Sequence, residues 1–132
     1  MDKKDVKLLN GLALAYIGDS AYENLIRHYL IETGQTRPNQ LHRAATKYVS
    51  GAAQAEIAKG LLEDEWFTAE ELDIYKRGRN AKSYTKAKNL DVTSYRVATG
   101  FEAVAGYLEM LGQADRLAEL VEYSIKKIEE SL

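Results

Sequence analysis

Two acidic residues, Asp19 and Glu102, each lie within an apolar stretch and have small residues close by in the sequence. A carboxylate in apolar surroundings costs several kcal/mol or is protonated unless a partner compensates its charge. Two carboxylates that come close repel each other unless a proton or a cation lies between them. Mg²⁺ prefers oxygen ligands, keeps several waters and can activate a bound water against a phosphate. The two residues are therefore candidates for a shared Mg²⁺ site; the alternative is a helix cap or two separate core salt bridges.

The segment from Lys76 to Arg96 concentrates positive charge in an otherwise acidic chain. It contains seven basic residues and one acidic residue, a charge of +6 against −8 over the rest of the 132 residues. Such an asymmetry indicates a polyanionic partner. Duplex RNA is contacted through its phosphates and 2′-hydroxyls, a task that suits Lys, Arg and Asn side chains. The predicted RNA-binding residues are Lys76, Arg77, Arg79, Asn80, Lys82, Lys86 and Lys88; the alternative is a solvated polar loop.

The residues Ile17-Gly18-Asp19-Ser20-Ala21, followed far downstream by Phe101-Glu102-Ala103, resemble two motifs of the ribonuclease III catalytic domain. With the basic segment between them, the resemblance covers essentially the whole chain. It is strongest to the miniature ribonuclease III subfamily, which has no separate double-stranded-RNA-binding domain. The resemblance implies that Asp19 and Glu102 are catalytic and bind Mg²⁺. It also implies hydrolysis of double-stranded RNA to 5′-phosphate and 3′-hydroxyl ends.

The sequence departs from the larger family members at two positions. Those proteins have a second acid four residues before the Asp and another three residues before the Glu, where this chain has Ala15 and Thr99. Either fewer protein ligands hold the metal, with waters or Thr99 taking their place, or another acid substitutes. Glu23 is a candidate because it lies four residues after Asp19 on the same helical face. A solvated or salt-bridged Glu23 is the alternative.

Apolar periodicity and capping signals predict a series of helices, and hence a single all-α domain spanning residues 1–132. One long helix is expected from about Val6 to Glu32, buried nearly all round. Further helices are expected from Pro38, after Ser50-Gly51, from Ala69 behind a Thr68/Glu71 capping box, from a cap at Thr93 or Ser94, and from Ala114 to Glu130. The stretch from Gly78 to Asp91 is expected to be an extended basic loop.

Apolar residues around Tyr16 and Ile17 exceed what a small core easily hides, so they predict a twofold dimer interface; the alternative is the buried core of a monomer. The resemblance implies the same homodimer, with two active sites along one RNA-binding valley. The chain lacks cysteine and any apolar run of about 20 residues, which favours a cytoplasmic protein without membrane contact.

The combined prediction is a homodimeric, Mg²⁺-dependent endoribonuclease. The resemblance implies a precursor stem of 23S ribosomal RNA as natural substrate, with a ribosomal protein or the pre-ribosome as a further candidate partner. The alternative function is a catalytically silent, double-stranded-RNA-binding dimer with the same fold. A helical DNA-binding regulator is a weaker alternative, because no short helix-turn-helix with a basic recognition helix is evident.

Overall fold

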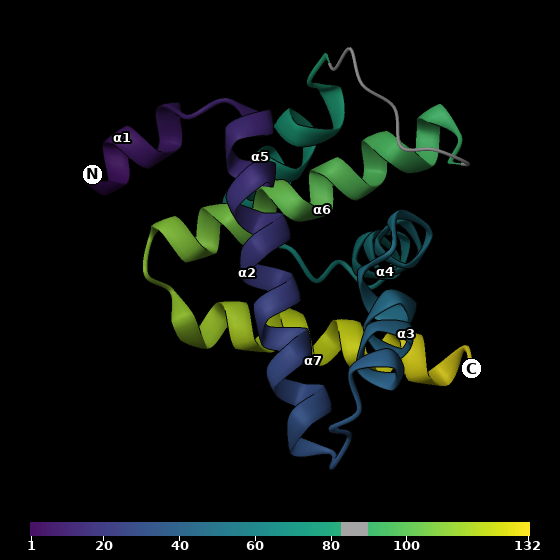
Figure 1. Ribbon diagram of the computed structural model, residues 1–132. Helices are drawn as coiled ribbons and strands as arrows, with labels where there is room; N and C mark the ends of the chain where they lie inside the picture. Colours follow the sequence, from purple (N-terminus) through teal and green to yellow (C-terminus); the bar gives the residue numbers. More distant parts are fainter. Residues whose placement is uncertain (83–89) are drawn as a thin grey trace.

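The computed structural model describes residues 1–82 and 90–132, and these residues form helices and connecting turns without a β-strand. The predicted all-α fold class is therefore confirmed. Figure 1 shows the helices in chain order. Their bounds are α1 Lys3–Leu8, α2 Gly11–Glu32, α3 Pro38–Val49, α4 Gly51–Glu63, α5 Ala69–Asn80, α6 Val92–Met110 and α7 Ala114–Glu130.

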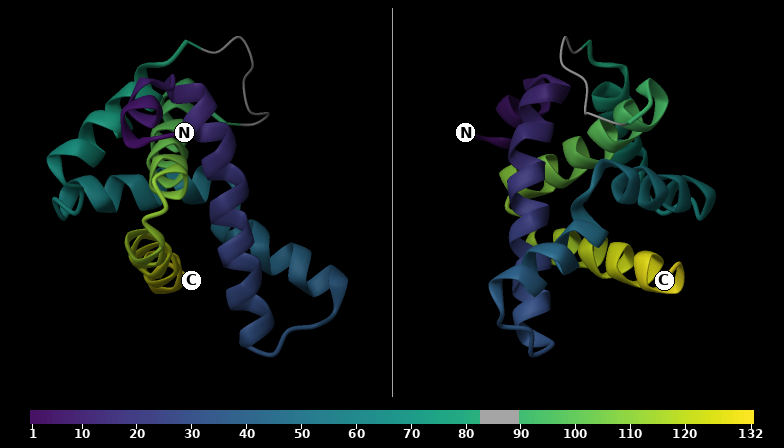
Figure 2. Two further views of the ribbon diagram at one scale, coloured as in Figure 1. Left: turned by 90° about the vertical axis from the view of Figure 1, so that its left-hand side faces the viewer. Right: turned by 45° about the vertical axis from the view of Figure 1, so that its right-hand side comes forward.

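Helix α6 is the centre of the fold. It crosses α2 on one side and packs against α4 and α5 on the other, while α7 runs below it (Figure 2). From Ala98 to Leu108 nearly every residue of α6 is buried, with Glu102 the exception at intermediate exposure. The all-round burial predicted for the first long helix thus belongs to α6. Helix α2 buries one face and leaves Leu12 and Tyr16 exposed.

The single long helix predicted from Val6 is in fact two helices. Helix α1 ends at Leu8, and Asn10 begins α2 as an N-cap whose side-chain oxygen accepts a hydrogen bond from the backbone N–H of Ala13 at 2.8 Å. Asparagine is among the preferred N-cap residues because its side chain can make this bond. Gly11 follows it and packs so tightly on α5 that a Cβ atom would lie 2.8 Å from the Arg77 carbonyl oxygen.

Most other predicted helix ends are confirmed. Pro38 opens α3, Ser50 caps α4, and Thr68 and Glu71 form the reciprocal capping box of α5. The predicted cap of α6 at Thr93 or Ser94 is wrong by two or three residues. Asp91 is the cap, and its carboxylate accepts from the Ser94 backbone N–H at 2.8 Å.

The predicted extended loop begins later than expected. Gly78 to Asn80 complete the last turn of α5, because Gly78 permits close packing on Thr99 and Gly100 of α6. Ala81 and Lys82 follow without helical structure. Lys86 and Lys88 lie outside the described residues. Within the described part of the chain, every helix is too short or too polar to span a bilayer.

Candidate active site

Helices α2 and α6 touch backbone to backbone at two glycines. A Cβ atom on Gly18 would lie 1.7 Å from the carbonyl oxygen of Glu102, and one on Gly106 would lie 1.8 Å from the carbonyl oxygen of Leu14. Real atoms do not approach so closely, so both positions require glycine. The crossing places the residue after Gly18, which is Asp19, directly beside Glu102.

The carboxyl groups of Asp19 and Glu102 lie within hydrogen-bonding reach of each other. Asp19 is exposed, whereas Glu102 is half-buried. Burial raises the pKa of Glu102 to about 8, and the hydrogen bond and negative charge of Asp19 contribute to this rise, against a lowering by Gln54. In the absence of a cation, a proton therefore offsets the repulsion between the two acids near neutral pH. The expectation that Asp19 itself is buried is wrong, because α2 turns this face to solvent.

The two positions that lack the larger family members' acids are both buried. Ala15 offers no ligand atom. Thr99 donates its hydroxyl to the Tyr95 carbonyl one turn earlier at 2.9 Å. The Thr99 hydroxyl thus bonds within its own helix, which gives no support to the alternative that Thr99 takes the place of a missing ligand.

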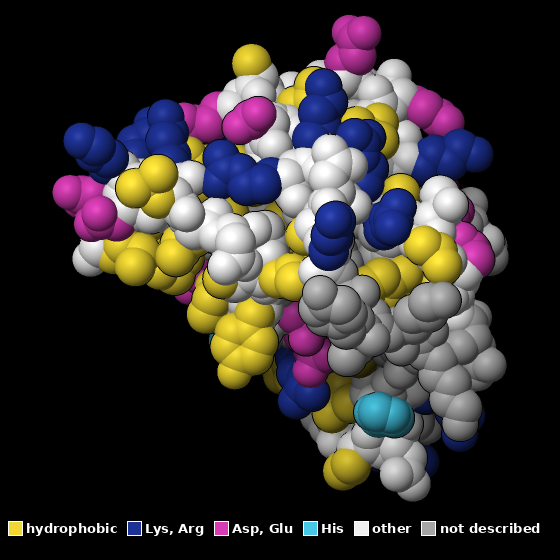
Figure 3. Space-filling view, turned by 90° about the horizontal axis from the view of Figure 1, so that it is seen from above, with side chains coloured by type: hydrophobic (Ala, Val, Ile, Leu, Met, Phe, Trp, Pro, Cys, Tyr) yellow, Lys and Arg dark blue, Asp and Glu magenta, His cyan; other side chains and the backbone are white. Residues whose placement is uncertain are grey.

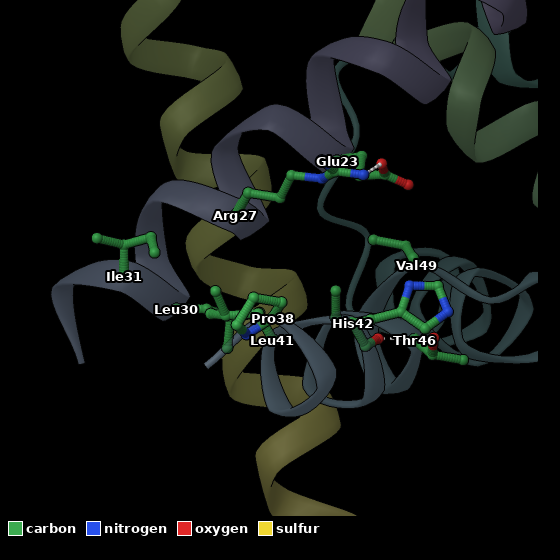
Figure 4. A pocket seen from close by; sticks show the side chains of 10 residues that line it. Glu23, Arg27, Leu30, Ile31, Pro38, Leu41, His42, Thr46 and Val49 are labelled. Atoms are coloured by element: carbon green, nitrogen blue, oxygen red, sulfur yellow. Dashed lines mark hydrogen bonds and ion pairs between the residues drawn. The ribbon is translucent and has the colours of Figure 1, made fainter. Parts of the chain in front are cut away.

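Glu23 is paired with an arginine of its own helix. Its carboxylate accepts a 2.5 Å hydrogen bond from Arg27, one turn later on α2. Figure 4 shows this pair at the rim of a pocket of about 450 Å³ between α2 and α3, with His42 and Thr46 on the opposite wall. The salt-bridged alternative for Glu23 is the arrangement that the structure contains.

Gln54 is a site residue that the sequence analysis missed. It comes from α4, is 2% exposed, and lies near enough to the Glu102 carboxyl group to lower its pKa. A single amide on an otherwise apolar helical face was the available signal, since buried polar groups need partners.

The predicted RNA-binding residues divide into two groups. Lys76, Asn80 and Lys82 are exposed. Arg79 is half-buried and lies over the Tyr75 ring with its guanidinium carbon 5.7 Å from the centroid. Figure 3 shows Lys and Arg side chains spread across this upper face of the molecule.

Arg77 is used within the fold. Its guanidinium donates to the carbonyl oxygens of Lys7 and Leu9 at 2.5 and 3.1 Å, and lies 3.5 Å from the Asp73 carboxylate. It therefore fastens α5 to the α1–α2 junction. A phosphate contact by Arg77 would compete with these bonds. Arg77 therefore differs from the other basic residues that were predicted to bind RNA.

The acidic pair suits a hard divalent cation. Among the described residues, no three His, Cys, Asp or Glu side chains gather at one point, so the protein offers two carboxylates and the neighbouring amide. Mg²⁺ binds through one or two carboxylates and otherwise retains water or takes phosphate oxygens. Asp19 and Glu102 share a proton when no cation is bound, so a Mg²⁺ ion between them would offset the same repulsion.

The ribonuclease III domain model matches residues 12–113, which include both acids and the α2–α6 crossing. The chain belongs to the ribonuclease III domain family. Proteins named Mini-ribonuclease 3 are similar over nearly their whole length. The protein from Enterococcus faecalis is 59% identical over 128 residues, covering 97% of each chain. That from Streptococcus pneumoniae is 54% identical over 125 residues, covering 95% of this chain and 98% of its own.

A solved structure has the same fold. The crystal structure of a protein from Fusobacterium nucleatum superposes with a TM-score of 0.79 at 29% identity, covering 92% of this chain and 96% of its own. The predicted miniature ribonuclease III membership and the predicted enzyme class, an endoribonuclease, are therefore confirmed. Ribonuclease III enzymes generally depend on a metal, in agreement with the paired acids.

Proposed function

We propose that this ribonuclease III chain, as one catalytic domain over residues 1–132, hydrolyses double-stranded RNA with Mg²⁺ held by Asp19 and Glu102. The observation that carries the proposal is the meeting of these two carboxyl groups, 83 positions apart in the sequence, at the α2–α6 crossing. Family membership supplies the reaction class. The geometry supports Asp19 and Glu102 as the two residues that this chain would use.

The protein's own groups have separate tasks in this mechanism. Asp19 is exposed and would face the RNA and solvent. The backbone of Glu102 is fixed by its contact with Gly18 of α2. Mg²⁺ bound there would provide an activated water and offset negative charge on the phosphoryl group. Glu102 must release its proton to bind the cation, because carboxylate ligands act in their ionised form. The products are a 5′-phosphate and a 3′-hydroxyl end.

Basic and polar side chains at the end of α5 and in the residues after it would hold the RNA backbone. Lys76, Arg79, Asn80 and Lys82 belong to this proposed surface, with Lys86 and Lys88 included from the sequence alone. Contacts to phosphates and 2′-hydroxyls give weak sequence preference and a strong dependence on salt. The natural substrate that we propose, a precursor of 23S ribosomal RNA in the cytoplasm, is the one that the resemblance to the miniature ribonuclease III subfamily implies. A ribosomal protein or the pre-ribosome is the further partner proposed with it.

A homodimer is part of the proposal. Tyr16 is 80% exposed, and Leu12, one turn before it, is 38% exposed, with Ile17 half-buried beside them. A large aromatic side chain in this setting is typical of an interface. Sedimentation of the wild type and of Tyr16→Asp tests it: we expect a dimer that the substitution dissociates, and a monomeric wild type contradicts it.

Cleavage of a long RNA duplex in Mg²⁺ or in EDTA tests the reaction. We expect cutting that requires Mg²⁺ and is lost in both Asp19→Ala and Glu102→Ala, with RNA binding retained. The second candidate, a catalytically silent RNA-binding dimer, is favoured by the buried, non-acidic Ala15 and Thr99. Tight duplex binding without metal-dependent cutting would establish that candidate instead.

A further inference from the structure

A neutral amide from a third helix lies beside the acidic pair. Gln54 belongs to α4, which packs against α6, and it is among the most buried polar residues of the described chain. Its neighbours on the buried face of α4 are apolar, namely Ala53, Ile57, Ala58 and Leu61. An amide in such surroundings costs free energy unless its polar atoms are paired. Its partners therefore indicate why it is there.

The Gln54 side chain is anchored at the junction of α3 and α4 and lies close to Glu102. Its Nε2 donates to the carbonyl oxygen of Val49, at the end of α3, at 3.2 Å. Ser50 fixes the same junction by accepting from the backbone N–H of Ala53. An amide nitrogen carries two hydrogens, so the bond to Val49 leaves a second N–H that can turn toward the neighbouring Glu102 carboxylate, whose pKa Gln54 lowers.

The site needs such support because it has few ligands. With Ala15 and Thr99 in place of acids and Glu23 bound to Arg27, Asp19 and Glu102 are the two acids that bring charge to the cation from residues 1–82 and 90–132. A glutamate side chain has several rotatable bonds, and holding it in one conformation costs entropy. A buried hydrogen-bond donor that fixes the carboxylate in advance lowers that cost on cation binding.

We propose that Gln54 is a positioning residue that holds the Glu102 side chain beside Asp19 in the conformation that binds the divalent cation. The inference rests on the proposed metal site. It assigns the supporting role to an uncharged side chain on α4, a helix outside the two that carry the acids. Residues that orient metal ligands through hydrogen bonds change metal affinity by about 10-fold to 100-fold when removed.

The test is Mn²⁺ binding without RNA, measured by electron paramagnetic resonance of free Mn²⁺. Gln54→Met has nearly the same shape without the amide, and Gln54→Asn keeps the amide but withdraws it by one carbon. We expect both to weaken Mn²⁺ binding about 10-fold or more. Ser124→Ala, which removes another fully buried polar group, is the matched control and should bind Mn²⁺ like the wild type. Thermal unfolding without metal identifies the variants that remain folded.

Each result separates the two proposals. If the wild type and Asp19→Asn bind Mn²⁺ equally or not at all, the metal site itself is wrong, and the role of Gln54 is overturned with it. If the wild type binds, Asp19→Asn does not, and a folded Gln54 variant binds like the wild type, only the role of Gln54 is overturned. Weaker binding in both Gln54 variants with Ser124→Ala unchanged supports it.

Discussion

Gly18 of α2 rests directly on the carbonyl group of Glu102 in α6, with no space between them for a side chain. The contact brings two helices together at the residue pair where the chemistry is proposed. Because Asp19 follows Gly18 and Glu102 carries the facing carbonyl, one backbone contact sets the separation of both acids. Stability and activity are therefore coupled at this point.

Gly18→Ala is expected to destabilise the protein by about 3 kcal/mol or more, as severe overpacking of a core does. The Cβ atom would meet backbone, which cannot rotate away as a flexible side chain could. Urea unfolding measures the change. Ser20→Ala, at an exposed position two residues later, is the control and should stay within about 0.5 kcal/mol of the wild type. Equal midpoints for both variants would show that the helices can separate freely.

The raised pKa of Glu102 predicts that the metal-free protein loses stability as pH rises. The folded carboxyl group holds its proton up to about pH 8, whereas the unfolded one releases it near 4.5. Between these values the native state binds more protons, so the free energy of unfolding falls with increasing pH. The contribution of Glu102 to the free energy of unfolding is fully present below the pKa of the unfolded state and is lost as the pH rises through the pKa of the folded state.

Glu102→Gln removes this titration and provides the check. In EDTA, the free energy of unfolding of the wild type should fall from pH 5 to pH 8 more than that of the variant, measured in urea. The difference is the contribution of one group, at most a few kcal/mol because Glu102 keeps some exposure to water. Parallel curves for the two proteins would mean that Asp19 and Glu102 do not share a proton.

Local signals in the sequence predict most helix ends well. The Thr68/Glu71 capping box, Pro38 at the start of α3 and the apolar stripe of α7 depend on neighbours within four residues, so they can be recognised without knowing the fold. The break at Asn10 was missed because the apolar pattern continues across it. There, one side-chain cap and the packing of Gly11 on α5 decide the outcome.

The arrangement of the site depends on long-range contacts that no local pattern contains. Both α2 and α6 are rich in apolar residues, and only the packed structure tells that α6 is the central one. The residues alone left the pairing of Asp19 with Glu102 as one of two alternatives, and the family resemblance favoured it. Gln54 was missed because its partner lies on another helix, 48 positions away. The internal use of Arg77 was missed because a charge count cannot distinguish a fold contact from a ligand contact.

Arg77→Met should lower stability by about 2 kcal/mol, because it removes charged hydrogen bonds to two carbonyl groups at the α1–α2 junction. The substitution keeps much of the length of the side chain. Lys76→Met, at the exposed neighbouring position, is the control and should leave the free energy of unfolding nearly unchanged. Urea unfolding measures the stability of both variants. Equal stabilities would contradict a structural role for Arg77 and leave it a candidate for RNA binding.

The exposed basic residues should control RNA affinity and its salt dependence without affecting folding. Lys76→Gln and Lys82→Gln each remove one charge that has no described ion pair within residues 1–82 and 90–132. A substitution that abolishes a true phosphate contact should reduce the slope of log affinity against log salt by about 0.9. Binding of an RNA duplex in EDTA at several salt concentrations measures it. Unchanged slopes would place RNA on another face.

Glu71 and Arg116 form the most buried ion pair of the described residues, and breaking it should cost about 3 kcal/mol. Arg116 donates to both carboxylate oxygens of Glu71 at 2.8 and 2.7 Å, and its guanidinium carbon lies 3.5 Å from the centroid of the Trp66 ring. Glu71→Gln leaves this cation with a neutral partner in a half-buried setting. Glu119→Gln removes the other, exposed partner of Arg116, where an ion pair contributes at most about 1 kcal/mol. Thermal unfolding of the two variants should therefore differ clearly; similar decreases in stability would mean that burial adds nothing to this pair.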